Sequence, residues 1–239
     1  MDNEVSPMSS QPLLPPSNAA LSLSLSLPSP REFLTALFDA LPTVPVPQFT
    51  PPGNPLLQLA PKDRSVFVTL HCLFPNDFVP ALDVLDRGLV TRVVQTAGGP
   101  DDDHENLPAV YYVRSSQPQS RGSARFRHYE PYEDAQKSYE VRLDSWNCSC
   151  PAFAFAAFSS SPEDVLPANG RGGVPAPPGT FGGLSLPLAS GADPVCKHLL
   201  ACFLAERCRA LFDASGMEYV REKRVSKAEM AGLAAGWNG

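Results

Sequence analysis

The distribution of proline sets the strongest limit on what this chain can fold into. Of its 27 prolines, thirteen lie in residues 1–61, seven in 62–151, seven in 152–194 and none beyond. Proline lacks a backbone N–H and fixes φ, so it interrupts helices and is excluded from central strands. We therefore predict a mostly disordered leader over residues 1–60, a folded domain over 62–212 and a C-terminal tail over 213–239.

One helix is predicted inside the leader, near residues 30–41. Ser29 can cap it, Pro30 suits its first turn, and Glu32 can complete a capping box. Apolar residues then follow at helical spacing: Phe33, Leu34, Leu37, Phe38 and Leu41. Because apolar helix faces usually pack within their own domain, docking on the domain is the favoured interpretation. A partner-binding helix is the alternative.

A second biased stretch, residues 159–193, contains seven Gly, six Pro and five Ser. We interpret it as a flexible insertion, which costs little because loop-closure entropy grows only slowly with length. A third stretch, residues 101–105, is acidic. It lacks the ligand spacing of a calcium loop, so a solvated turn is the favoured interpretation.

The rest of the chain alternates between two periodicities. Helical spacing occurs in 62–74, 78–87 and 199–212, and strand-like patterns occur in 89–95, 109–114 and 139–143. The first helical segment also contains residues that suit a strand. The phenylalanine-rich residues 151–158 predict a short helix. Its phenylalanines are expected to lie in the core, with a partner-binding groove as the alternative. Together these patterns predict an α+β fold, with a small antiparallel sheet and helices packed on one face.

Four residues are candidates for chemistry: Cys148, Cys150, Cys196 and His198. They form a C-x-C pair and a C-x-H pair with 45 residues between them. Three thiolates and an imidazole complete the tetrahedral ligand set of structural zinc, and soft donors favour zinc over magnesium or calcium. We therefore predict one structural zinc ion. Residues two apart on a helix face different sides, so Cys196 is expected just before a helix and His198 in its first turn.

The remaining thiols and imidazoles have ordinary interpretations. Cys72, Cys202 and Cys208 are expected to be buried as small apolar residues, with Cys202 as a spare ligand in the alternative. His71, His104 and His128 lack neighbouring ligands. The acidic start of the chain is unlike a secretory signal, so the six cysteines indicate reduced thiols rather than disulfides. No acid or amide partner for a catalytic thiol is identifiable, and without any Gly-Lys dipeptide the chain has no P-loop.

Two short segments carry a family resemblance. Residues 148–155 read CSCPAFAF and residues 196–201 read CKHLLA. Both resemble a SWIM zinc finger, and more narrowly the SWIM-domain subunits of the Shu complex, a recombination-mediator assembly of eukaryotes. The similarity runs over about residues 66–212. It departs from the family in the long gap between ligand pairs and in the leader, and neither departure removes a ligand.

The resemblance implies a nuclear, non-enzymatic subunit without a small-molecule substrate. Its zinc module would support pairing with a RecA-like recombinase paralogue, and the pair would promote recombinase filament assembly in homologous recombination repair. The first alternative is a SWIM interaction module of a ubiquitin-ligase or transposase-derived protein. The second is a thiol enzyme using a Cys/His pair.

Charge and hydropathy limit the remaining partners. The net charge of −6 argues against DNA binding by the isolated chain, so DNA contact is expected only through the complex. Two basic clusters are candidates for that contact: Arg121, Arg125, Arg127 and His128 form one, and Arg221, Lys223, Arg224 and Lys227 form the other. No apolar run approaches the roughly 18 residues of a membrane span, so no membrane association is expected.

Overall fold

A computed structural model provides the structure of the chain. It describes residues 27–41, 56, 59–96, 109–115, 137–158, 179–185, 193–213 and 218–236. The leader before residue 27, the acidic loop, the first basic cluster and most of the predicted insertion lie outside these residues.

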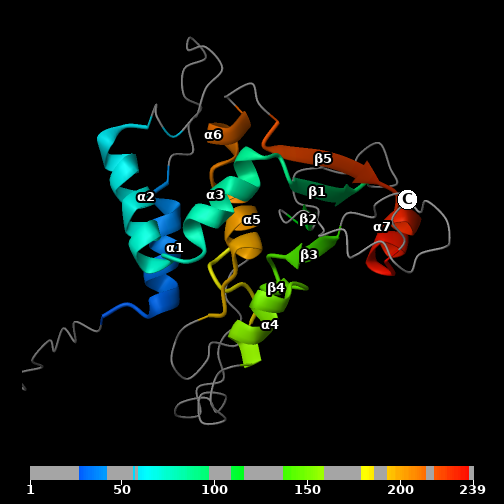
Figure 1. Ribbon diagram of the computed structural model, residues 1–239, viewed down its shortest axis with the longest axis horizontal. Helices are drawn as coiled ribbons and strands as arrows, with labels where there is room; N and C mark the ends of the chain where they lie inside the picture. Colours follow the sequence, from blue (N-terminus) through cyan, green and yellow to red (C-terminus); the bar gives the residue numbers. More distant parts are fainter. Residues whose placement is uncertain are drawn as a thin grey trace, which may run out of the picture.

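The described strands form one mixed sheet in the order β4-β3-β2-β1-β5 (Figure 1). They are β1 (Val90–Gln95), β2 (Ala109–Arg114), β3 (Ser138–Arg142), β4 (Asn147–Cys148) and β5 (Val220–Val225). The first four are antiparallel, as predicted, but β5 pairs with β1 in parallel. The prediction of a purely antiparallel sheet was therefore wrong at this edge. The sequence VREKRV lacks the apolar alternation of a half-buried strand, because β5 is an edge strand with four exposed charged residues.

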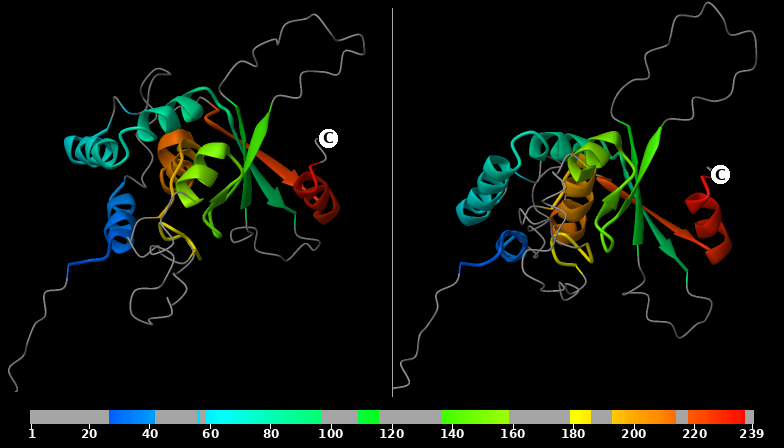
Figure 2. Two further views of the ribbon diagram at one scale, coloured as in Figure 1. Left: turned by 60° about the horizontal axis from the view of Figure 1, so that its bottom comes forward. Right: turned by 90° about the horizontal axis from the view of Figure 1, so that it is seen from below.

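The helices confirm an α+β fold and cover both faces of this sheet. They are α1 (Pro30–Asp39), α2 (Pro61–Leu73), α3 (Phe78–Asp86), α4 (Pro151–Phe158), α5 (Lys197–Arg207), α6 (Arg209–Asp213) and α7 (Lys227–Ala234). Helix α5 lies on one face with α3 beside it, whereas α7 packs on β1 and β5 from the opposite side (Figure 2). The expectation that all helices share one face was therefore wrong. The helix on the other face, α7, belongs to residues 213–239, which were predicted to form a tail.

Two other helix predictions needed correction. Residues 199–212 do not form one helix, because Cys208 leaves the helical region at φ −109° and separates α5 from α6. In α4 only Phe153 belongs to the core, while Phe155 and Phe158 are exposed. Among the described helices, none alone is long and apolar enough to cross a membrane. Helices α2 and α3 reach that length and composition only as a pair bent by 120°.

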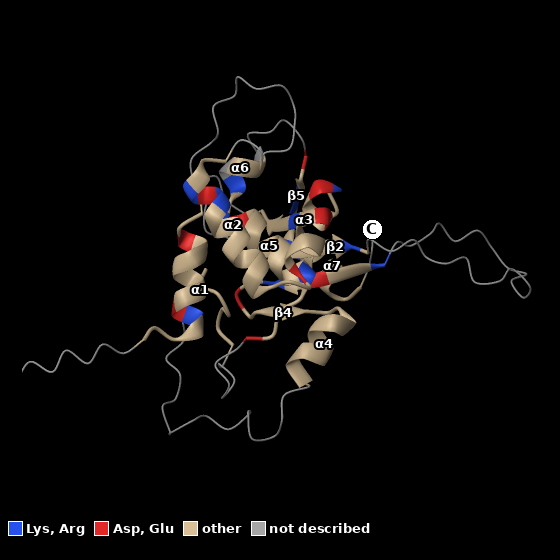
Figure 3. Ribbon diagram, turned by 60° about the vertical axis from the view of Figure 1, so that its left-hand side comes forward, with Lys and Arg blue, Asp and Glu red and all other residues tan. Residues whose placement is uncertain are grey.

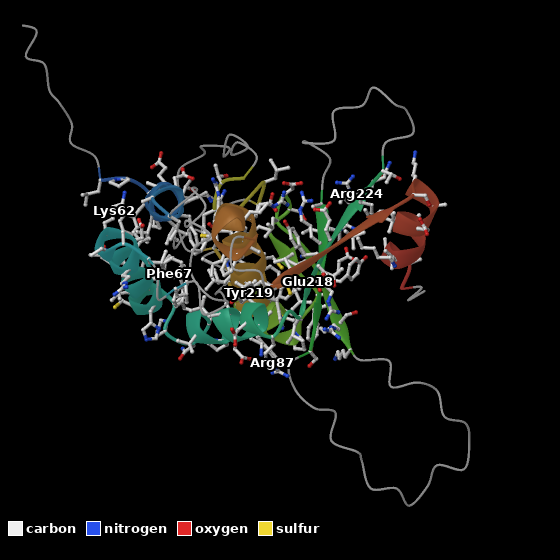
Figure 4. All side chains as sticks on the ribbon, turned by 90° about the horizontal axis from the view of Figure 1, so that it is seen from above. Lys62, Phe67, Arg87, Glu218, Tyr219 and Arg224 are labelled. Carbon is white, nitrogen blue, oxygen red and sulfur yellow. The ribbon has the colours of Figure 1, made fainter. Side chains whose placement is uncertain are left out.

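The core fills the space between α5, the helices beyond it and the sheet. Phe67 of α2 and Tyr219, just before β5, are among its members (Figure 4). At its centre Phe203 of α5 meets Phe38 edge-on, with ring centroids 4.7 Å apart, and Trp146 at 5.4 Å. Aromatic rings at such distances bury large areas and prefer these tilted arrangements.

The fourth aromatic residue of this cluster comes from the predicted insertion. Phe181 is fully buried, 4.5 Å from the Trp146 ring and 5.6 Å from Phe38. Residues 179–185 form an ordered turn, so the interpretation of all of 159–193 as flexible was wrong here. Gly182 and Gly183 have φ of +87° and +51°, and a Cβ on either would lie 2.5 Å from neighbouring atoms. The glycines that resemble a linker are therefore required by a tight turn.

The same turn holds the leader helix. The capping box of Ser29 and Glu32 is present at the start of α1, as predicted. Arg31 forms an ion pair with Asp193, whose side chain is 1% exposed, and the Phe181 N–H donates to Thr35 Oγ1 at 3.1 Å. With Phe38 also buried, the favoured interpretation of α1 as a helix docked on its own domain is confirmed.

Candidate metal centre

The structure brings the four predicted ligands into one buried cluster. The Sγ atoms of Cys148, Cys150 and Cys196 and a ring nitrogen of His198 all lie within 4.8 Å of one another. Cys148 Sγ lies 3.9 Å from His198 Nδ1. Sulfur ligands about 2.3 Å from a tetrahedral metal would lie about 3.8 Å apart. The donor set and its spacing therefore fit a tetrahedral metal ion.

A tight turn aims the first ligand pair. Strands β3 and β4 pair Val141 with Cys148, and between them Trp146 adopts a positive φ of 47°. The Trp146 indole Nε1 donates to the Pro194 carbonyl at 2.9 Å. Because Trp146 lies two residues before Cys148 and Pro194 lies two residues before Cys196, this bond joins the two segments that carry the ligands.

Two of the thiols also sit at helix N-termini. Cys150 Sγ accepts from the Phe153 N–H at 3.3 Å at the start of α4. Cys196 is the N-cap of α5, and its Sγ accepts from the Leu199 N–H at 3.5 Å. His198 is then in the first turn, which confirms the predicted placement of this pair. Both sulfurs face the positive end of a helix, which stabilises thiolates.

Without a metal, the three thiols do not ionise equally. Hydrogen bonds from the Cys148 and Cys196 side chains lower the pKa of Cys150. The pKa of Cys148 is raised by its hydrogen bonds with Cys150 and Cys196 and by burial. For Cys196, the bond with Cys148 lowers the pKa, but the bond with Cys150 and burial outweigh it and raise the pKa to about 12. The shifts run in opposite directions within one buried cluster, and a bound cation would favour the thiolate form of all three.

Asp77 supports the site from outside the ligand set. It stands at the N-cap position of α3, where the sequence suggests a capping residue, but its side chain makes no cap bond. Its carboxylate instead accepts from the backbone N–H of Lys197, the residue between two ligands. Burial raises the pKa of Asp77, this hydrogen bond opposes the rise, and the charge of Cys150 adds to it. Sequence analysis missed this role, because only the packing of α3 on α5 creates it.

The other candidate residues lie apart from the cluster. Cys202 and Cys208 are buried, as predicted, and burial raises the pKa of both thiols. Cys72 is exposed on α2, so the prediction of burial was wrong there. His71 is exposed and lies near the Phe78 ring at 6.2 Å, whereas His104 and His128 fall outside the described residues. In the described part of the chain, no second group of three such residues gathers as these four do.

The arrangement fits a structural rather than a catalytic centre. Four protein ligands complete a tetrahedral set, so no coordination position is left for water or a substrate. A metal held there would tie the β3–β4 turn to the start of α5, because the two ligand pairs that it joins are separated by 45 residues of the chain. Its chemistry would be to neutralise the thiolates and fix both segments.

Comparison with known proteins supports this assignment. The chain is 25% identical over 186 residues to the zinc finger SWIM domain-containing protein sws1 of Schizosaccharomyces pombe (strain 972 / ATCC 24843). The match covers 76% of this chain and 71% of that protein. This chain resembles a SWIM zinc-finger protein. No family model matches it.

Proposed function

We propose that this protein is a non-enzymatic, zinc-binding subunit that acts in homologous recombination repair. It pairs with a RecA-like recombinase paralogue and promotes assembly of recombinase filaments in the nucleus. The observation that carries the proposal is the similarity to sws1 over 186 residues, together with a Cys₃His cluster at the SWIM motif. Cys148, Cys150, Cys196 and His198 hold one zinc ion, which stabilises the fold without taking part in a reaction.

The charges of the described surface favour action through a protein partner. Three basic residues of β5 stand in the predicted DNA-contact cluster, but acidic neighbours accompany them. Arg224 pairs with Glu222 at 3.2 Å, and Arg221 lies 3.7 Å from Glu218. With a net charge of −6 as well, the isolated chain is expected to bind DNA weakly and the complex to supply the contact.

Affinity purification of the tagged chain from its own cells tests this function. Mass spectrometry of the eluate should identify a RecA-like paralogue, and metal analysis should find one zinc per chain. His198→Ala should lose both, whereas Cys72→Ser, which removes an exposed thiol far from the cluster, should keep both. Recovery of ubiquitin-ligase components without a recombinase paralogue would instead favour the first alternative, a SWIM interaction module of a ubiquitin-ligase or transposase-derived protein.

Thiol labelling tests whether the protein acts as an enzyme. With zinc bound, the three ligand thiols should resist alkylation, and a chelator should expose them. Cys72 is expected to react at an ordinary rate in both states, because it is exposed. A single hyperreactive thiol among the ligands would instead support a thiol enzyme and contradict the proposal.

A further inference from the structure

Helix α4 exposes an apolar surface that nothing in the described protein covers. Its eight residues read PAFAFAAF, without a charged or polar side chain, and it is uniformly tan in Figure 3. Phe155 is 73% exposed and Phe158 is 86% exposed. Helices that are apolar all round are normally buried, and contiguous exposed apolar patches mark interaction sites.

The helix is held firmly at its other side. It begins directly after the ligand Cys150, whose Sγ accepts from the Phe153 N–H, and Phe153 itself is buried in the core. The exposed phenylalanines are therefore fixed relative to the metal centre. A fixed surface loses little conformational entropy on binding, which favours its use as a docking site.

A cleft runs along α4 toward the metal centre. Its volume is about 510 Å³, and no Lys, Arg, Asp or Glu lines it. Apolar side chains of Trp146, Phe153, Ala157 and Phe158 line it beside Cys148 and Cys150, and so do four uncharged polar residues, Ser145, Asn147, Ser149 and Ser185. A charged group entering this cleft would lose its hydration without meeting a counter-charge. The lining therefore favours an uncharged segment, whose aliphatic or aromatic side chain would pack on Phe153, Ala157 and Phe158.

The possible occupants differ in how well they fit. The residues directly after α4 are Ser159, Ser160, Ser161, Pro162, Glu163 and Asp164, and the first large apolar side chains after them are Val165 and Leu166. A second copy that docked through α4 alone would form too small a contact, since each copy would offer only Phe155 and Phe158. Two phenylalanines also offer only on the order of 300 Å², against about 800 Å² per partner in stable complexes. The occupant must therefore reach beyond α4.

We propose that α4 and its cleft form a docking surface for the protein partner, which inserts one large apolar side chain between α4 and β4. The partner segment is uncharged at that point and covers Phe155 and Phe158. This inference rests on the proposed function, in that the partner is the RecA-like paralogue. It adds the surface that binds the paralogue and the chemistry of the segment that is bound.

A matched set of variants tests the surface. The double variant Phe155→Ser, Phe158→Ser removes both exposed rings, and Val68→Ser removes a 61% exposed apolar side chain from α2 as the control. Affinity is measured with the purified paralogue. The double variant should bind it at least about 100-fold more weakly, because central aromatic residues dominate interfaces. The control should bind within about twofold of the unchanged protein. Both should keep the zinc content and melting temperature of the unchanged protein.

A photocrosslinking residue at position 155 identifies the occupant. In the purified complex it should crosslink to an apolar segment of the paralogue. A crosslink to a second copy or to this chain's own residues, or no crosslink, would overturn the docking proposal. Unchanged affinity of the double variant would overturn it as well. Failure of the unchanged protein to recover any RecA-like paralogue would overturn the proposed function and, with it, this partner.

Discussion

Helices α4 and α5 begin in the same way and end in opposite environments. Each starts directly after a cysteine of the metal cluster, and in each that sulfur accepts a backbone N–H of the first turn. Helix α4 consists of Ala and Phe after its first proline, and α5 carries three Leu, two Ala and one Phe. Yet α5 is buried continuously from His198 to Ala205, whereas α4 has one buried residue, Phe153.

The difference lies in what covers each helix. Helix α5 is enclosed by α3, by the sheet, and by α1 with the turn at residues 179–185. Helix α4 rests chiefly on β4. The metal cluster thus fixes two apolar helices but provides a core for only one of them. The exposure of α4 is therefore best explained by a role in binding a protein partner.

Removal of the proposed zinc should have the largest effect, and it should act on both helices. Chelation removes the cation that would offset the thiolate charges and releases the link between the β3–β4 turn and α5. Zinc binding contributes on the order of 10 kcal/mol in small zinc modules, so the metal-free domain should unfold or melt far lower. Circular dichroism during heating, with and without chelator, measures this.

Cys72→Ser is the control for that experiment, because it removes a thiol outside the cluster. It should melt like the unchanged protein and respond equally to chelator. A domain that keeps its full melting temperature after complete removal of the metal would contradict a structural zinc site.

The same substitution on the two helices should separate them next. Phe203 of α5 is 2% exposed at the centre of the aromatic cluster, and Phe155 of α4 is 73% exposed. Phe203→Ala should cost about 3–5 kcal/mol of the free energy of unfolding, and Phe155→Ala less than about 0.5 kcal/mol. Urea unfolding of both variants measures the difference. Equal costs would mean that α4 is covered within the protein itself.

Sequence patterns predicted the parts of this contrast that depend on local spacing. The four ligands, the helix starts at Pro30 and after Cys196, and the strands β1 to β3 all follow from short-range rules for caps, periodicity and ligand pairs. Local rules also placed a helix at residues 151–158. They did not predict its exposure, because eight apolar residues look the same whether or not another element covers them.

The remaining misses have the same cause. Phe181 is one aromatic residue in a Gly-rich stretch, and only its contacts with α1 and α5 reveal that it is core. Strand β5 carries four charged residues in a row and is specified by pairing with β1 rather than by its own pattern. Asp77 has the sequence position of a helix cap, but α5 supplies its hydrogen-bond donor.

A smaller effect on the free energy of unfolding should follow when the contact between α1 and the turn at residues 179–185, which together cover α5, is weakened. Arg31 bonds to Asp193 through Nε at 3.1 Å and to the Ser185 carbonyl at 2.9 Å, which holds α1 against the turn at residues 179–185. Arg31→Ala leaves the buried Asp193 carboxylate without its cation and, among the described residues, with only the Ser185 hydroxyl, at 3.4 Å, as a donor, so it should cost about 1–3 kcal/mol. The free energy of unfolding should fall no further than undocking of α1 allows. Faster hydrogen exchange over residues 30–39 would report that undocking. Arg221→Ala, which removes an exposed pair with Glu218, is the control and should change neither stability nor exchange.

A small effect on stability is expected at the end of α4, where the two helices differ in charge. The last turn of α5 contains Arg207, whereas the last turn of α4 contains no basic residue. Phe158→Arg places a cation at the negative end of the α4 dipole on a side chain that is 86% exposed. It should therefore leave the free energy of unfolding unchanged or raise it by about 0.3–1 kcal/mol.

The same charge beside the uncharged cleft should abolish binding of the paralogue, since the partner's apolar side chain would have to desolvate it. Urea unfolding and affinity measurements on one preparation test both outcomes. A variant that is destabilised by several kcal/mol would show that Phe158 belongs to the fold, whereas one that is stable and still binds would show that α4 is not the docking surface.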